Sequence, residues 1–243
     1  MKKQKLRWKR VLLKLSGETL SGKGKFGIDV AATQYIAQEI KLARGLGVEI
    51  AIVIGGGNFI RGEKLSRLGI ERPTADAMGM LSTLINALAL QSALEQHDLN
   101  TRIMSALTVV QIAEPYTRRR SIEHIEQGRV VICAGGTGNP YFTTDTAAAL
   151  RASEIRAEVI LKATRVRGVY DSDPTTNKHA RFLHSIDPRD MIRHNLRVMD
   201  LTAATLSLES GMPIVVFDVF KKGNLKRLLL GQRIGSEIHP PKV

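Results

Sequence analysis

The feature that most constrains the fold lies within residues 129–150, where an apolar run, a glycine-rich loop and a helix start follow one another. Residues 130–134 (VVICA) are apolar and bounded by turn residues, which predicts a buried strand. Residues 135–140 (GGTGNP) can continue neither strand nor helix, and residues 143–145 offer cap side chains to an alanine-rich helix beginning near Thr146. Exposed N–H groups and the positive end of a helix favour a bound anion. The loop exceeds the usual length of about two to six residues, so we interpret it as a binding loop, the alternative being an ordinary strand–helix connection.

Two other apolar runs also end in residues suited to a phosphate. Val48–Ile54 leads directly into Gly55-Gly56-Gly57-Asn58, where the absence of side chains lets the backbone approach a ligand closely. Arg61 follows, and a guanidinium group can bind phosphate with two hydrogen bonds. Val11–Leu15 ends beside a turn, and Lys14 there could neutralise a phosphate. Taken singly, the three glycines would be only a tight turn, and Lys14 alone is more simply explained as a surface lysine.

Strand and helix patterns alternate along the chain, which predicts an α/β fold with a largely parallel sheet covered on both faces. Ligands of such folds bind at the carboxyl edge of the sheet, where the two glycine loops would meet and could hold two phosphorylated ligands. Asp76, ahead of one long apolar helix, is either an N-cap or a carboxylate directed at sugar hydroxyls. Helices are expected at residues 30–46, 77–96, 116–127, 146–156, 188–196, 201–209 and 224–230, and further strands at 101–107, 159–164, 213–218 and 234–238, the last at the sheet edge.

Several function classes are disfavoured. Residues 22–27 (GKGKFG) match the dinucleotide-binding glycine pattern, but they neither follow a strand directly nor open a helix, so we reject a Rossmann site. The histidines show no ligand spacing and Cys133 is the only cysteine, which argues against structural zinc and intrachain disulfides. No run of bilayer-spanning length and no secretory signal is evident, so we expect a cytoplasmic protein.

The net charge of +13 favours anionic partners. Six of the positive charges lie in the first ten residues, and we divide the chain into a basic N-terminal tail, residues 1–10, and a single domain, residues 11–243. A nucleic-acid-binding regulator is therefore one alternative. The sequence has no helix-turn-helix, aromatic platform or RNA-binding module, so nucleic acid is not expected as the main partner.

Five motifs, in order and at characteristic spacing, resemble those of the bacterial-type uridylate (UMP) kinases, a branch of the amino acid kinase family. The similarity runs from about Lys9 to Gln232, and the TGNPYFTTD stretch is specific to this branch. The motifs are Lys14-Leu15-Ser16-Gly17, Gly55-Gly56-Gly57-Asn58 with Arg61, Gly138 to Asp145, Lys162-Ala163-Thr164 and Met199-Asp200-Leu201.

The resemblance implies a three-layer αβα sandwich with a mostly parallel central sheet, assembled as a homohexamer. It also implies transfer of the γ-phosphoryl group of MgATP to UMP, giving UDP and ADP in pyrimidine nucleotide biosynthesis. Activation by GTP and inhibition by UTP are common in the family. The acceptor is already an anion, so alignment and charge neutralisation suffice without a general base.

The resemblance also assigns site residues by position. Lys14, Arg61 and Asp145 are the catalytic set, with Lys14 neutralising the transferred group and Asp145 orienting the lysines. Tyr170 stands where phenylalanine is frequent. ATP is assigned to Lys14, Leu15, Ser16, Gly17, Gly57, Arg61, Thr164, Tyr170 and Asp173. UMP is assigned to Gly56, Asp76, Thr137, Gly138, Asn139, Pro140, Tyr141, Phe142, Thr143 and Thr144.

A nearer alternative is another member of the amino acid kinase family, such as a carbamate or acetylglutamate kinase. The TGNPYFTTD loop discriminates between these possibilities, because it suits a nucleotide better than a small carboxylate.

Overall fold

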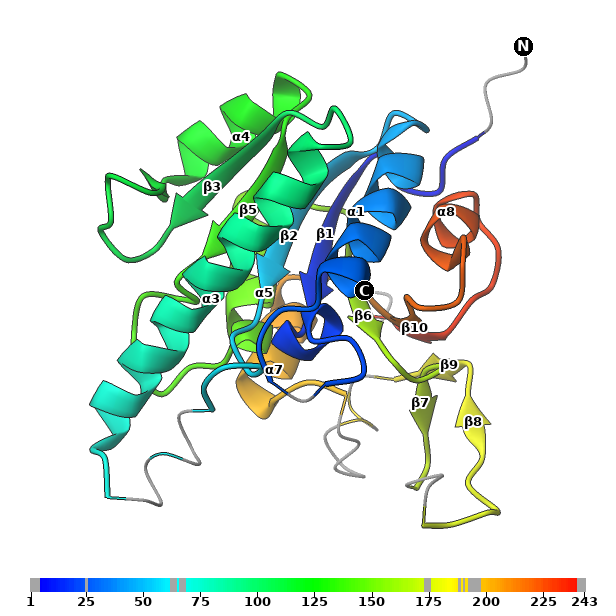
Figure 1. Ribbon diagram of the computed structural model, residues 1–243. Coiled ribbons are helices and arrows are strands. Elements are labelled where there is room, and N and C mark those ends of the chain that lie inside the picture. Colours follow the sequence, from blue (N-terminus) through cyan, green and yellow to red (C-terminus); the bar gives the residue numbers. More distant parts are fainter. Residues whose placement is uncertain are drawn as a thin grey trace.

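Among the residues that the structure describes, nine strands form one sheet with helices on both faces (Figure 1). The structure, a computed structural model, describes residues 5–24, 26–61, 65, 69–172, 176–187, 189, 191 and 198–239. The strand order in the sheet is β4-β3-β5-β2-β1-β6-β10-β11-β9, and β7 and β8 form a separate hairpin. The strands are β1 (Arg10–Leu15), β2 (Glu49–Ile54), β3 (Thr101–Ser105), β4 (Glu114–Pro115), β5 (Val130–Ala134), β6 (Val159–Thr164), β7 (Val169–Tyr170), β8 (Phe182–Leu183), β9 (Ser185–Ile186), β10 (Ile214–Asp218) and β11 (Ser236–Ile238).

The centre of the sheet is parallel, as predicted. β1 pairs in parallel with β2 and with β6, β2 pairs in parallel with β5, and the antiparallel pair is β10 with β11. The carboxyl ends of β1, β2, β5 and β6 therefore lie at one edge of the sheet, and the loops that follow them meet there.

The helices form two outer layers, which confirms the αβα sandwich. Successive residues of a strand point to opposite faces, and Leu13 and Leu12 accordingly belong to different hydrophobic clusters. The cluster around Leu13 includes side chains of α1, α3 and α8, and the cluster around Leu12 includes those of α4, α5 and α7. The helices are η1 (Gly17–Leu20, a 3₁₀ turn), α1 (Val30–Arg44), α3 (Arg72–Glu95), α4 (Arg118–Glu126), α5 (Thr144–Glu154), α7 (Leu201–Glu209) and α8 (Asn224–Leu229).

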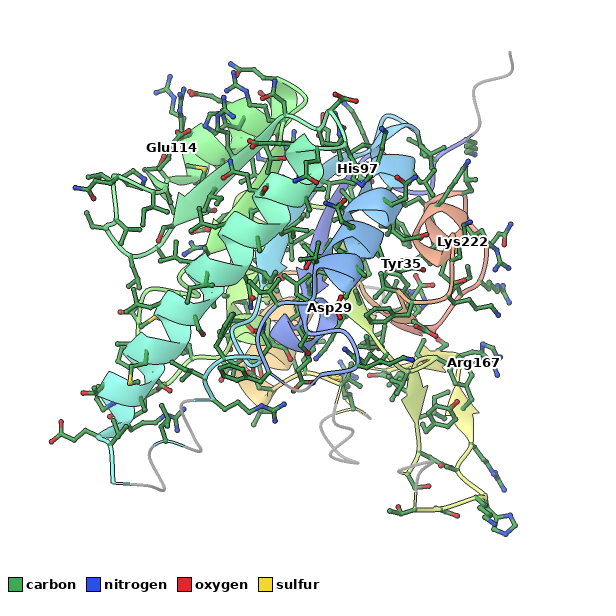
Figure 2. The ribbon with its side chains drawn as sticks, viewed as in Figure 1. Asp29, Tyr35, His97, Glu114, Arg167 and Lys222 are labelled. Carbon is green, nitrogen blue, oxygen red and sulfur yellow. The ribbon has the colours of Figure 1, made fainter. Side chains whose placement is uncertain are left out.

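Polar side chains fix where several helices begin. Asp29 caps α1 by accepting the Ala32 N–H at 2.8 Å (Figure 2). Thr143 caps α5 and Asp200 caps α7 in the same manner. These three caps agree with the sequence prediction, since such side chains satisfy N–H groups that a first helical turn leaves unpaired, although α5 begins at Thr144 rather than near Thr146.

Three features differ from the prediction. Helix α3 begins at Arg72 rather than at residue 77, with Pro73 in its first turn, a position that proline favours. β11 is not an edge strand, because β9 pairs with its outer side. The β7–β8 hairpin was not predicted; it extends from the sheet near the carboxyl end of β6 (Figure 1). Most of the helix expected at 188–196 lies outside the described residues.

Helix α3 is relevant to the prediction that no segment of the chain is long and apolar enough to cross a membrane. The sequence analysis expected no segment of bilayer-spanning length, whereas α3, with 24 residues, is the one described helix that is long and apolar enough to cross a membrane. Half of its apolar window (50%) is buried inside the fold, as in the core helix of a globular protein.

Candidate functional site

A largely buried cluster of one acid and two lysines lies at the carboxyl ends of the central strands. Lys14 on β1 and Lys162 on β6 are partners in the parallel register, so they stand side by side. Asp145, in the first turn of α5, lies between them: its Oδ1 is 2.7 Å from Lys14 Nζ and its Oδ2 is 2.6 Å from Lys162 Nζ. Lys162 also donates a hydrogen bond to the Val198 carbonyl. The carboxylate thus fixes two ammonium groups in adjacent positions.

The charges in this cluster depend on one another. Burial alone would raise the pKa of Asp145, but the attraction of Lys14 and Lys162 outweighs it and lowers that pKa below its ordinary value. Burial lowers the pKa of Lys162, and the neighbouring Lys14 charge adds to this effect against the attraction of Asp145. An anionic group arriving beside the lysines would add the negative charge that this excess of cations favours.

Two loops of the site touch each other through glycines. Gly55 donates its N–H to the Leu15 carbonyl at 2.9 Å, which joins the ends of β2 and β1. A Cβ atom on Gly17 would lie 2.3 Å from Asn58 Oδ1 and 2.8 Å from Gly55 O, so only glycine fits there. The side chain of Leu15 is fully buried, so only its backbone faces the site. Ser16 accepts the Thr19 N–H at 3.0 Å through its carbonyl and thereby starts the η1 turn.

The loop after β5 needs glycine for a different reason. Gly135, Gly136 and Gly138 have φ angles of +76°, +59° and +82°, which side chains rarely adopt. Tyr141 adopts a positive φ as well, at +72°. This left-handed backbone makes the loop compact and explains the glycine spacing in the sequence.

Asp76 is brought to this loop and does not cap α3, so the N-cap alternative was wrong. Because α3 begins at Arg72, Asp76 lies inside its first turns, where its Oδ2 accepts both the Tyr141 N–H at 2.7 Å and Arg72 Nε at 2.8 Å. The Arg72 guanidinium also lies 5.6 Å from the centre of the Tyr141 ring. Arg72 was missed by the sequence analysis, because the helix was expected to begin after it.

The end of the same loop is tied to α7 through Asp200. Thr143 donates to the Asp200 carboxylate, and Thr146 Oγ1 lies 3.1 Å from Asp200 Oδ1. A cavity of about 580 Å³ opens between the loop and α7. Its lining includes Thr137, Asn139, Phe142, Thr202 and Thr205. The acid was predicted as a cap for α7; its link to the loop carried no sequence signal.

Arg61 lines a second and larger cavity, of about 690 Å³. It forms an ion pair with Glu18 of η1, and both side chains are about half exposed, at 50% and 43%. Arg165, which also lines this cavity, donates to the Glu18 carbonyl at 2.6 Å. Phe26, from the basic glycine loop, also lines this cavity. The next helix after that loop in the described chain, α1, starts at Val30, so the loop does not open a helix directly, in agreement with the rejection of a Rossmann site.

Two residues that the resemblance assigns to ATP, Thr164 and Tyr170, lie at the end of β6 and on β7. Thr164 Oγ1 lies 2.9 Å from the Val166 carbonyl oxygen and 3.1 Å from the Phe217 carbonyl oxygen, either of which can accept its proton. Tyr170, on β7, packs edge to face against Phe182 of β8, with ring centres 5.3 Å apart. Asp173 lies outside the described residues.

Comparisons with known proteins match nearly the whole chain. Residues 9–218 match the model of the amino acid kinase family. The crystal structure of UMP kinase from Bacillus anthracis superposes with a TM-score of 0.93 at 38% identity, covering 97% of each chain. The crystal structure of UMP kinase from Ureaplasma parvum gives a TM-score of 0.89 at 35% identity, covering 96% of this chain and 100% of the other.

Proposed function

Because the chain belongs to the amino acid kinase family, we propose that it transfers the γ-phosphoryl group of MgATP to UMP, giving UDP and ADP for pyrimidine nucleotide biosynthesis. The observation that carries the proposal is the Lys14–Asp145–Lys162 cluster at the strand ends where the two glycine-rich loops meet. UMP kinases of known structure match the chain over nearly its whole length, and the family and fold agree with the sequence-based resemblance.

The proposed phosphoryl transfer requires cationic groups and alignment of the two substrates rather than a general base. The phosphate of UMP is already an anion and can attack without losing a proton. Two anionic groups must be held together against their repulsion, and Lys14, Arg61 and backbone N–H groups supply the opposing charge. Asp145 acts on the reaction by holding Lys14 and Lys162 in place.

We propose the following division of the site. Gly57, Arg61 and the Lys14–Gly17 segment bind the phosphates of ATP, with Thr164, Tyr170 and Asp173 at its nucleoside. Gly56, Asp76 and the Thr137–Thr144 loop bind UMP. The hydrogen bond between Asp76 and the Tyr141 N–H supports the second group, because it joins two members that are far apart in the sequence.

Mg²⁺ enters this reaction as part of the substrate MgATP. Among the described residues no group of three or more His, Cys, Asp or Glu side chains could form a metal cage, and the Asp145 carboxylate is occupied by two lysines. Mg²⁺ usually keeps several waters and binds through one or two carboxylates together with substrate phosphates.

We also propose self-association as a homohexamer, GTP activation and UTP inhibition, and a cytoplasmic location for a single kinase domain spanning residues 11–243. Self-association is supported by an exposed apolar row on α3, formed by Leu81, Ile85 and Leu88 with exposed fractions of 49%, 47% and 40%. Apolar surface of this kind is typical of sites where proteins meet.

The test is ATP-dependent formation of nucleoside diphosphate with UMP, CMP and dTMP as separate acceptors. Turnover confined to UMP is the expected result, and GTP and UTP are then added as effectors. Absence of turnover with any nucleotide, in a folded protein that binds ATP, would refute the proposed reaction. Carbamate and acetylglutamate, supplied with ATP, test the other activities of the family.

A further inference from the structure

Three polar side chains lie fully buried on the otherwise apolar inner face of α3. Ser82 and Thr83 are 1% exposed and Asn86 is 0% exposed. A buried polar group costs free energy unless it is hydrogen-bonded, so each needs a partner inside the fold. The partners include the backbones of both glycine-rich loops.

Asn86 holds the loop after β2 through a complete amide pair. Its Nδ2 donates to Gly55 O at 2.7 Å and to Asn58 Oδ1 at 2.7 Å. Asn58 Nδ2 returns a hydrogen bond to Asn86 Oδ1 at 3.0 Å and donates its second proton to Gly27 O at 2.7 Å. All four protons of the two side-chain amides are donated, so the hydrogen bonds fix the orientation of both amide groups.

Ser82 contacts the next carbonyl of the same loop, Gly56 O, which also accepts the Phe59 and Ile60 N–H groups at 3.0 Å. Its Oγ lies 3.1 Å from Gly56 O and 2.7 Å from Gly79 O, one turn earlier in α3. A Cβ atom on Gly56 would lie 1.9 Å from Ser82 Oγ, so the loop is pressed against the helix. The carbonyls of Gly55 and Gly56 thus both face α3. In a trans peptide the following N–H points the opposite way, so the N–H groups of Gly56 and Gly57 point away from the helix, as anion binding by this loop requires.

Thr83 reaches the other loop. Its Oγ1 accepts the Gly135 N–H at 2.7 Å and donates to Met80 O at 2.7 Å. The carbonyl of the same peptide unit, Ala134 O, accepts the Ala106 N–H at 3.0 Å on the other side. The first peptide of the Gly135 loop is therefore held from both directions.

We propose that Ser82, Thr83 and Asn86 are positioning residues for phosphoryl transfer, which set the placement of the two glycine-rich loops relative to each other. They act through the backbones of Gly55, Gly56 and Gly135. The inference rests on the proposed function, because the proposed function assigns the two loops to the two nucleotides. Apolar side chains would fill the same space without any need for hydrogen-bond partners. We therefore attribute the polar side chains to their hydrogen bonds with the loop backbones.

The main test compares Thr83→Val with Thr83→Ser. Valine keeps the shape of threonine but leaves the Gly135 N–H without its acceptor, whereas serine keeps the hydroxyl. We expect Thr83→Val to raise the KM for UMP about fivefold or more, the equivalent of one hydrogen bond of roughly 1 kcal/mol, and to leave the KM for ATP within about twofold. Thr83→Ser should restore the KM for UMP. Thr33→Val is the matched control, since Thr33 is a buried helical threonine whose hydroxyl donates to Asp29 O.

Ser82→Ala provides a second and milder test. It removes one oxygen atom and should lower kcat/KM for both nucleotides, because the Gly55–Gly57 loop is assigned to both. Ser121→Ala is its control: Ser121 is fully buried in α4 and its hydroxyl donates to Thr117 O at 2.9 Å, away from the loops.

Amide hydrogen exchange tests the same hydrogen bonds and does not depend on enzyme activity. Exchange at Gly135 should accelerate about tenfold in Thr83→Val and stay unchanged in Thr33→Val. Unchanged exchange at Gly135 together with an unchanged KM for UMP would overturn the proposal, as would an equal rise in KM in Thr33→Val. A wild-type protein without UMP turnover would refute the proposed function instead, and the exchange data would still report on the support of the loops.

Discussion

Asp76 and Tyr141, which are 65 residues apart in the sequence, are joined by a hydrogen bond of 2.7 Å from the Tyr141 N–H to Asp76 Oδ2. The bond connects the start of α3 to the loop after β5. Arg72 reaches the same oxygen, and we propose that the carboxylate also accepts a ribose hydroxyl of UMP. Asp76 therefore shapes the acceptor side of the site and has no contact assigned to ATP.

Asp76→Asn is expected to raise the KM for UMP about tenfold or more while changing the KM for ATP little. The neutral amide weakens the hydrogen bonds that a carboxylate accepts, and hydrogen bonds to charged groups contribute roughly 1.5–3 kcal/mol. Steady-state kinetics with each nucleotide varied in turn measures the effect. A selective loss of ATP binding would overturn the assignment.

Lys14→Met is expected to lower kcat by at least about a hundredfold, roughly 2.7 kcal/mol, with little change in the KM for UMP. Methionine has a similar length but no charge, so the transferred group loses a neutralising partner. Lys41→Met, on the exposed face of α1, is the control. An unchanged kcat in folded Lys14→Met would dismiss the role of Lys14.

Asp145→Asn should destabilise the fold by about 3–5 kcal/mol at neutral pH, because two buried lysines lose their counter-charge. The wild type should also lose stability in acid. The pKa of Asp145 is lowered in the folded state, so the unfolded chain takes up the proton first as the pH falls. The stability from this group is therefore present above about pH 5 and declines below about pH 4, toward the lower pKa of the folded state.

Chemical denaturation at pH 7 and pH 3 measures both effects. The difference between the two pH values should be smaller in Asp145→Asn than in the wild type. Asp98→Asn serves as the control, because Asp98 is exposed and its positive φ of 61° suits asparagine. An equal pH dependence in the wild type and Asp145→Asn would contradict the prediction.

Two glycines should respond to alanine in opposite ways. In Gly17→Ala the new Cβ would meet the backbone of the neighbouring loop, 2.8 Å from Gly55 O and 2.9 Å from Gly57 N, so we expect strained loops and a drop in kcat/KM of at least about tenfold. Gly79→Ala places its Cβ in open space on α3, where alanine should stabilise the helix by about 0.5–1 kcal/mol. Thermal unfolding and kinetics distinguish the two; a stabilised and fully active Gly17→Ala would contradict the close contact.

The parts of the fold that follow from local patterns were predictable. The parallel sheet followed from apolar strands alternating with helices, and the caps at Asp29, Thr143 and Asp200 followed from side chains that can accept the first N–H groups. Burial of Cys133 likewise followed from its strand: the residue is 3% exposed, and burial raises the pKa of its thiol to about 12.

Features that depend on tertiary contacts were not predictable in this way. The start of α3 was placed too late, because the apolar repeat begins after Arg72 and Pro73. Lys162 lies in one of the recognised motifs but was not assigned to the site. Its register with Lys14 across β1 and β6 gives it the same acidic partner, Asp145. Ser82, Thr83 and Asn86 were hidden in an apolar helix, since their partners are backbone atoms far away in the chain.

The attachment of both glycine-rich loops to α3 affects how the site tolerates thermal motion. We expect a small tilt or slide of the helix to displace Gly55, Gly56 and Gly135 in the same direction, because each is hydrogen-bonded to it. Such a movement is common to the two loops and cancels in the distance between them. The spacing on which in-line transfer depends is thereby less sensitive to motion of the helix than the position of either loop alone.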